Sequence, residues 1–240
     1  MLRQGTVCVD GAFGACYNKL ERKRNESFGR GPGRRGSAAM ADEMIQKIRE
    51  YKPFNEQEER DREVLLRLLS GAEDVYSREN LTAHMTASAW VVNEARDKVL
   101  MAYHNIYHSW SWLGGHADGE RDLLAVALRE VGEESGVIHV RPLSEEIFSL
   151  EILTVDGHEK RGKYVPSHLH LNLTYLLEAR EGDALSMKAD ENSGVAWFGL
   201  EEAVKASTEP WFKERVYGKL NEKLRRWRAD RKIGPEPVEK

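Results

Sequence analysis

Three glutamates stand at helical spacing within the segment GHADGERDLLAVALREVGEESGV, which runs from Gly115 to Val137. Glu130, Glu133 and Glu134 lie at i, i+3 and i+4, so a helix places them within an arc of about 100° on one face. Like charges this close weaken a helix unless a cation lies between them. Hard divalent ions such as Mg²⁺ bind carboxylate oxygens together with phosphate oxygens of a substrate. The alternative is a solvated acidic face near a helix end.

Glycines on both sides of this acidic stretch favour a ligand site over a solvated face. Gly114 and Gly115 come just before it, and two adjacent glycines let the backbone approach a ligand closely. Gly136 follows the glutamates and can end the helix. The segment therefore predicts a helix from about Asp122 to Ser135 that presents carboxylates to a bound ion.

On these residues, the segment resembles the signature of the Nudix hydrolase family. That signature is a Gly, five residues, a Glu, seven residues, and then Arg-Glu-apolar-any-Glu-Glu-any-Gly-apolar. One position differs: Arg121 stands where the family has its first Glu, and Glu120 comes one residue earlier. In the family that Glu is usually a structural partner, so we expect catalysis to survive and Glu120 to hold Arg129. The matching residues are Gly115, Arg129, Glu130, Val131, Glu133, Glu134, Gly136 and Val137.

The resemblance implies an α/β fold, namely a Nudix-type α/β/α sandwich with a mixed sheet, with extra N-terminal and C-terminal helices. It also implies hydrolysis of nucleoside diphosphates linked to another moiety, in which a metal-activated water attacks a phosphorus. Mg²⁺, or alternatively Mn²⁺, would be bound by Glu130, Glu133, Glu134 and the backbone carbonyl of Gly114, while Arg129 would orient Glu130. Such an ion polarises phosphoryl oxygens and offsets the charge of the substrate.

Family members often recruit one more acid from a late loop, as general base or extra ligand. Glu191 is the best-placed residue for this role, with Asp190 as its alternative. Both precede a short strand expected over residues 195–198. The other interpretation of either residue is a solvated loop acid.

Three further side chains are candidates for substrate binding. The strand expected over residues 167–177 places His168 and His170 on one face, where imidazoles suit phosphate or base contacts. The alternative is a polar face turned to solvent. Trp112 suits stacking on a base, although a tryptophan on a strand is often part of a core.

Two other functions fit the same fold. Isopentenyl-diphosphate isomerase shares it and binds a divalent metal, but it needs a cysteine in its site, and this chain has none after Cys16. A non-catalytic nucleotide-binding module would be expected to lose the metal-site glutamates, and all three are present. We therefore expect a Nudix-type pyrophosphohydrolase, with the binding module as the alternative. Nucleoside triphosphates, nucleotide sugars and dinucleotide polyphosphates all stay open as substrates.

Strands and helices are interspersed along the chain, which favours a layered α/β or α+β domain. Short helices are expected around residues 44–48 and from Asn55 to Gly71, where Asn55 and Glu58 resemble a capping box. Thr208 can cap a last helix with an apolar stripe from Phe212 to Trp227. The expected strands are residues 82–92, 99–103, 108–113, 147–154, 167–177 and 195–198.

Charge separates the first forty residues from the rest. Residues 1–40 hold eight Lys or Arg against three acids, a net charge of +5, and the chain as a whole carries −4, which leaves −9 for residues 41–240. A leader, a transit peptide and a nucleic-acid-binding arm are the alternatives for residues 1–40. The expected domains are a disordered basic glycine-rich leader over 1–40, a helical extension over 41–80, the Nudix domain over 81–207, an amphipathic helix packed on it over 208–232, and a tail over 233–240.

Composition also limits the location and the partners. No run of 18 apolar residues occurs, which excludes a membrane-spanning helix, and two cysteines cannot supply a disulfide framework. We expect a cytoplasmic protein with a nucleotide-type small-molecule substrate and no clear nucleic-acid partner. The last helix is basic from Lys219 to Lys232, which indicates either a packed helix with a solvated face or a contact with a partner, such as the second subunit of a homodimer.

Overall fold

The computed structural model describes residues 43–160, 162–188 and 192–232. The chain divides into two units, Met1–Ala39 and Met40–Lys240, and all described residues lie in the second. The expected leader over 1–40 and the tail over 233–240 lie outside the described residues. No helix among the described residues is long and apolar enough to cross a membrane.

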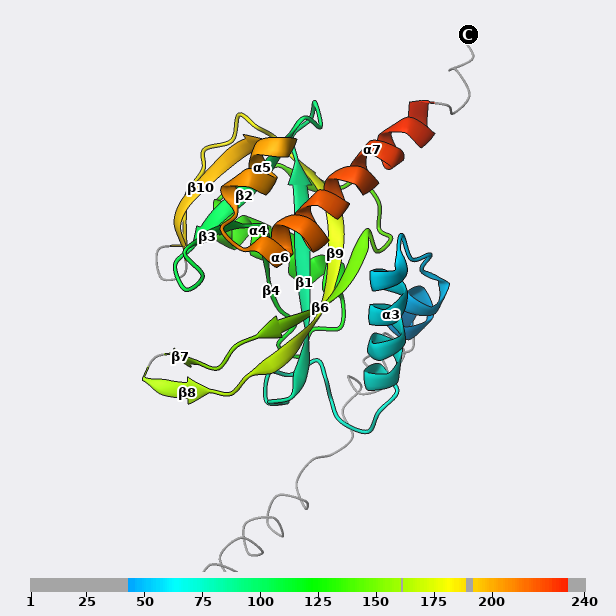
Figure 1. Cartoon of the computed structure of the whole chain (residues 1–240). Coiled ribbons are helices and arrows are strands. Elements are labelled where there is room, and N and C mark those ends of the chain that lie inside the picture. Colours follow the sequence, from blue (N-terminus) through cyan, green and yellow to red (C-terminus); the bar gives the residue numbers. More distant parts are fainter. Residues whose placement is uncertain (1–42, 161, 189–191, 233–240) are drawn as a thin grey trace, which may run out of the picture. The chain divides into compact units, whose positions relative to one another are not determined.

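An eight-stranded mixed sheet lies at the centre of this unit (Figure 1). Its main path runs β10-β2-β1-β9-β5, with β3 on β2, β4 on β1 and β6 on β9. The central strands β1 and β9 are parallel, and the other pairs are antiparallel. The strands are β1 (Ala83–Val92), β2 (Lys98–His104), β3 (Ser109–Ser111), β4 (Leu113–His116), β5 (Val140–Pro142), β6 (Ser149–Val155), β9 (His168–Ala179) and β10 (Asn192–Gly199), and a separate hairpin joins β7 (His158–Lys160) to β8 (Lys163–Val165).

Helices cover both faces of the sheet, because β1 carries apolar residues on each of its sides. Ala87 and Ala89 belong to a core that they share with α4, whereas Trp90 and Val92 belong to a second core shared with α5, η1 and α7. Sheet faces alternate along a strand, so these cores lie on opposite sides. The expected α/β/α sandwich with a mixed sheet is confirmed. The helices are residues 43–50, α3 (Glu56–Leu69), α4 (Leu123–Ser135), α5 (Leu200–Ala206), α6 (Pro210–Phe212), the π-helical turn η1 (Lys213–Tyr217) and α7 (Gly218–Lys232).

Four buried charged side chains connect α3, β6 and α7. The ammonium of Lys219 on α7 lies 2.9 Å from a Glu151 oxygen and 3.2 Å from a Glu58 oxygen, and that of Lys223 lies 2.8 Å from Glu58. Both carboxylates are fully buried. Burial raises the pKa of Glu58, but Lys219 and Lys223 outweigh that effect and hold the pKa below its usual value. The charges therefore balance within the cluster.

Several elements differ from their expected bounds. The side chain of Asn55 caps α3 by accepting from the N–H of Glu58 at 3.0 Å, which is one half of the predicted capping box. The Glu58 carboxylate accepts instead from the N–H of Phe54 at 2.7 Å. Thr208 does not cap the last helical region, which begins at Pro210 behind Glu209; its hydroxyl donates instead to the carbonyl of His108. That region is also divided by η1. The strand expected over residues 108–113 is divided into β3 and β4, and β4 continues through Gly114 and Gly115. The strands β5, β7 and β8 and helix α5 were not expected, because each is too short to show a clear period in the sequence.

Candidate functional site

The acidic helix forms where the sequence predicts it, because both of its ends carry capping residues. The side chain of Asp122 accepts from the N–H of Ala125 at the start of α4. Gly136 ends the helix in the left-handed region, with φ of 73°. With the helix bounded by these two caps, its periodicity places Glu130 and Glu134 on the side that faces β4.

Two of the three glutamates lie against the glycine pair of β4. Glu130 is 8% exposed and Glu134 is 6% exposed. One Glu134 oxygen accepts a hydrogen bond from the N–H of Gly114 at 2.9 Å, and the other accepts one from the side-chain amide of Asn192 at 3.4 Å. A Cβ added to Gly115 would lie 2.5 Å from the carboxyl carbon of Glu130. The missing side chain is therefore what allows this strand to approach the carboxylates.

The third glutamate faces outward into ion pairs. Arg129 lies 2.8 Å from a Glu130 oxygen and 3.4 Å from a Glu133 oxygen, and Lys188 lies 3.5 Å from the other Glu133 oxygen. Arg129 is thus in contact with Glu130, the residue that it was expected to orient. The ligand atoms of Glu130, Glu133 and Glu134 do not all lie within 4.8 Å of one another; within the described ranges, only a histidine cluster meets that condition.

Arg121, which stands where the family signature has its first Glu, has a structural role of its own. Arg121 lies over the ring of Tyr76, with 4.1 Å between its guanidinium carbon and the ring centroid, and it pairs with Asp74 at 3.2 Å. Glu120 accepts hydrogen bonds from the N–H groups of Arg121 and Asp122. Hydrogen bonds from the N–H groups of Asp122 and Arg121 lower the pKa of Glu120, and the charge of Arg129 adds to that effect. Within the described part of the chain, however, no ion pair joins Glu120 to Arg129, so the expectation that Glu120 holds Arg129 by direct contact is wrong. Glu130 and Glu133 hold Arg129 instead.

The candidate substrate residues lie on the sheet face opposite α4. In β4, Gly115 points toward Glu130, so the next residue, His116, points to the other face. The parallel register pairs His84 with His170, and His168 precedes it by two residues on the same face. Trp112 is half-buried, with its ring edge-on to Tyr217 at 5.8 Å on that face.

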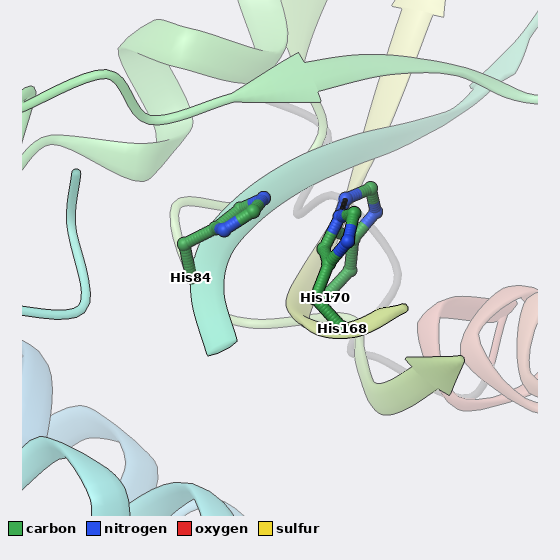
Figure 2. Close-up of side chains that lie close together, drawn as sticks. All are labelled: His84, His168 and His170. Atoms are coloured by element: carbon green, nitrogen blue, oxygen red, sulfur yellow. Dashed lines mark hydrogen bonds between the residues drawn. The ribbon is translucent and has the colours of Figure 1, made fainter. Parts of the chain in front are cut away.

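Histidines gather at the start of the two parallel strands (Figure 2). The ring of His84 lies 4.7 Å from that of His168 and 5.1 Å from that of His170, between centroids. Burial, together with the neighbouring imidazoles, lowers the pKa of His170 to about 2, and burial lowers that of His84. These two rings are therefore neutral at physiological pH. Beyond them along β9, Asn172 accepts from the hydroxyls of Thr86 and Ser88.

Two residues near these sites were not singled out from the sequence. Asn192, which contacts Glu134, follows Glu191 directly in the sequence, and its role was not visible without the fold. His84 was missed although a signal existed, because His84, Thr86 and Ser88 form a polar alternation within an otherwise apolar strand. Glu191 and its alternative Asp190 lie outside the described residues.

The residues of α4 fit the divalent ion that the signature implies. Glu130, Glu133 and Glu134 offer only carboxylate oxygens, the ligand type that Mg²⁺ and Mn²⁺ prefer. Glu130 and Glu134 are nearly buried, and a bound divalent ion would add its charge to the contacts that they already make with Arg129, Gly114 and Asn192.

Comparison with known proteins finds several similar structures and one matching family model. The structure resembles a C. elegans Ap4A hydrolase in a binary complex, with 21% identity over 61% of this chain and 98% of that one and a TM-score of 0.46. It also resembles a NUDIX-family hydrolase from Clostridium perfringens (20% identity, 60% and 97% coverage, TM-score 0.42) and a MutT protein from Methanosarcina mazei (18%, 59% and 94%, 0.41). The family model of the NUDIX domain matches residues 82–220. Since this match spans more than half of the chain, the protein belongs to the Nudix hydrolase family.

Proposed function

We propose that the protein is a Mg²⁺-dependent pyrophosphohydrolase that cleaves a nucleoside diphosphate linked to another moiety. The observation that supports this most directly is the position of Glu130 and Glu134, two nearly buried carboxylates against the backbone of Gly114 and Gly115. Family membership supports the reaction type. The choice of Mg²⁺ over Mn²⁺ rests on the family resemblance alone.

Each residue has a separate role in this proposal. Glu130, Glu133, Glu134 and the carbonyl of Gly114 would hold the ion, which polarises phosphoryl oxygens and lowers the pKa of the attacking water. Arg129, 2.8 Å from Glu130, orients that carboxylate. The N–H of Gly114 fixes the Glu134 carboxylate at 2.9 Å.

Further parts of the proposal rest on the sequence. Glu191 is the proposed general base, and Trp112 the proposed contact with the base of the substrate. Residues 41–240 carry a net charge of −9, which repels a polyphosphate unless a cation is bound. A cytoplasmic location and a homodimer also stay predictions.

A substrate panel with matched variants tests the reaction. The panel holds nucleoside triphosphates, ADP-ribose, nucleotide sugars and dinucleotide polyphosphates, each with Mg²⁺ and with Mn²⁺. Glu134→Gln keeps an acceptor for the N–H of Gly114 but removes the charge. We expect this variant to lower kcat at least about 100-fold on the preferred compound, a loss typical of one preorganised electrostatic group.

Glu145→Gln is the control, because it makes the same chemical change at an exposed residue outside the site. It should keep the wild-type rate. Equal rates for Glu134→Gln and wild type would remove Glu134 from the mechanism. If the folded protein hydrolysed no compound of the panel, the binding-module alternative would replace the enzyme.

A further inference from the structure

Three histidines converge on the sheet face that α4 does not cover. His84 comes from β1, while His168 and His170 come from β9, and the three offer ligand nitrogens within 4.8 Å of one another. The parallel pairing of the two strands brings them together, since His84 is the register partner of His170. Figure 2 shows the rings of His168 and His170 side by side, with that of His84 opposite.

Hydrogen bonds fix which nitrogen of two rings carries the proton. Nδ1 of His84 lies 3.0 Å from the carbonyl oxygen of Asn80, and Nδ1 of His168 lies 2.8 Å from that of Pro166. A carbonyl oxygen only accepts, so both Nδ1 atoms donate. In each neutral ring the lone pair is therefore on Nε2. This arrangement, in which a backbone carbonyl orients the far nitrogen, is the usual one for a metal-bound histidine.

Nε2 of His84 is a buried acceptor without a hydrogen-bond partner. His84 is 4% exposed, and its Nε2 is among the buried side-chain atoms of the described residues for which no partner exists. Buried polar atoms in proteins are ordinarily paired. The atom lies on the side of the ring away from Asn80, toward the other two histidines (Figure 2).

The spacing of the other two nitrogens matches a shared metal ion. Nε2 of His168 lies 3.2 Å from Nε2 of His170. Two nitrogens at 2.0–2.1 Å from a tetrahedral zinc ion are about 3.3–3.4 Å apart. A proton on His170 would also explain this contact, but it would leave Nε2 of His84 unpaired. A metal ion would satisfy all three nitrogens, which lie within 4.8 Å of one another.

We propose that His84, His168 and His170 bind one transition-metal ion of the Zn²⁺ type, at a site separate from the glutamates of α4. Imidazole nitrogens suit Zn²⁺, whereas carboxylate oxygens suit Mg²⁺, so the two sites select different ions. Three histidines leave a fourth position for water or an anionic ligand. The lone pairs of His168 and His170 then serve the metal, so these residues contact a substrate only through it.

The cluster is shielded from solvent, since His84 is 4% exposed and His168 is 8% exposed. The ring of His116 lies 5.1 Å from that of His84 and 4.9 Å from that of His170, and forms a further wall of the site.

Titration of the metal-stripped full-length protein with Co²⁺ tests the proposal without an activity assay. Excess Mg²⁺ is present to occupy the glutamates. We expect one equivalent of Co²⁺ to bind with the intense visible absorption of a tetrahedral site. His84→Ala and His170→Ala should each weaken Co²⁺ binding at least about 100-fold, since even residues that only support a ligand contribute 10–100-fold.

Two controls separate this site from others on the protein. His139 is exposed, so His139→Ala should leave Co²⁺ binding unchanged, and Glu134→Gln should do the same. Wild-type protein that binds no Co²⁺ under excess Mg²⁺ would refute the proposal. Binding that survives His84→Ala but is lost in Glu134→Gln would refute it as well.

A measurement on the wild-type protein tests the proposal even if the variants at His84 and His170 do not fold. X-ray absorption of the Zn²⁺-loaded protein should give a nitrogen shell at about 2.0–2.1 Å with the scattering pattern of three imidazoles. A shell of carboxylate and water oxygens would overturn the histidine site.

Discussion

Gly115→Ala is the most direct test of the link between the glycine pair and the glutamates. The added Cβ would lie 2.5 Å from the carboxyl carbon of Glu130 and 2.7 and 2.8 Å from its two oxygens. Ordinary contacts between such atoms are about 3.5–4.0 Å, so the carboxylate must move by about 1 Å. A displacement of that size at a catalytic group costs about 100-fold in rate, or about 2.7 kcal/mol of transition-state stabilisation.

The same substitution should leave the fold nearly intact. The crowded atoms belong to the end of the Glu130 side chain rather than to the backbone, and Gly115 does not have a positive φ. We therefore expect the free energy of unfolding in urea to change by less than about 1 kcal/mol. The assay is kcat/KM on the preferred compound of the panel with Mg²⁺, measured beside the urea titration.

Gly132→Ala is the matched control, because it makes the same chemical change on α4 between two of the glutamates. The nearest atom to its added Cβ is 3.9 Å away. It should keep the wild-type kcat/KM and gain up to about 1 kcal/mol of stability, since alanine favours a helix over glycine. If Gly115→Ala kept more than about a third of the wild-type kcat/KM, contact between β4 and Glu130 would not control catalysis.

The buried charge cluster gives two further predictions. Lys219→Met leaves Glu151 and Glu58 short of a counter-charge, so it should lower the free energy of unfolding in urea by about 3–5 kcal/mol. Adding Glu151→Gln to this variant should restore part of the lost stability. A loss below about 1 kcal/mol in Lys219→Met would contradict the pairing. The folded-state pKa of Glu58 lies below its usual 4.5, so the carboxylate contributes stability above pH 4.5 that is lost as the pH falls below it. Glu58→Gln should therefore lose stability less steeply below pH 4.5 than wild type or the exposed control Glu59→Gln, and parallel curves would disprove this assignment.

The part of the fold that could be predicted from the sequence is the part whose stabilising residues are neighbours in the chain. Helix α4 begins and ends within one residue of its expected bounds, because Asp122 and Gly136 are local caps. The strand β1 was predicted nearly to its ends because apolar and polar residues alternate from Ala83 to Ala89 and lead into the apolar residues 90–92. Helix α5 was missed because it has seven residues and no side-chain cap at Gly199.

Features that depend on strand register could not be predicted. His84 and His170 meet only because β1 and β9 pair in parallel in one register, and no local pattern specifies that register. For the same reason the sequence did not show that His168 and His170 lie on the opposite face from α4. The contact between Arg129 and Glu130 was expected, since neighbouring positions in the signature carry it. The stacking of Arg121 on Tyr76 was not, because Tyr76 lies in a turn far away in sequence.

The ion pairs between Glu58 and the two lysines of α7 have a consequence for how the chain opens. Glu58 lies in the first turn of α3, near the start of the described chain, and Lys219 and Lys223 lie near its end. Neither helix can detach without leaving an uncompensated charge in an apolar environment. Helices α3 and α7 should therefore unfold as one cooperative unit, and removing either helix would weaken the other.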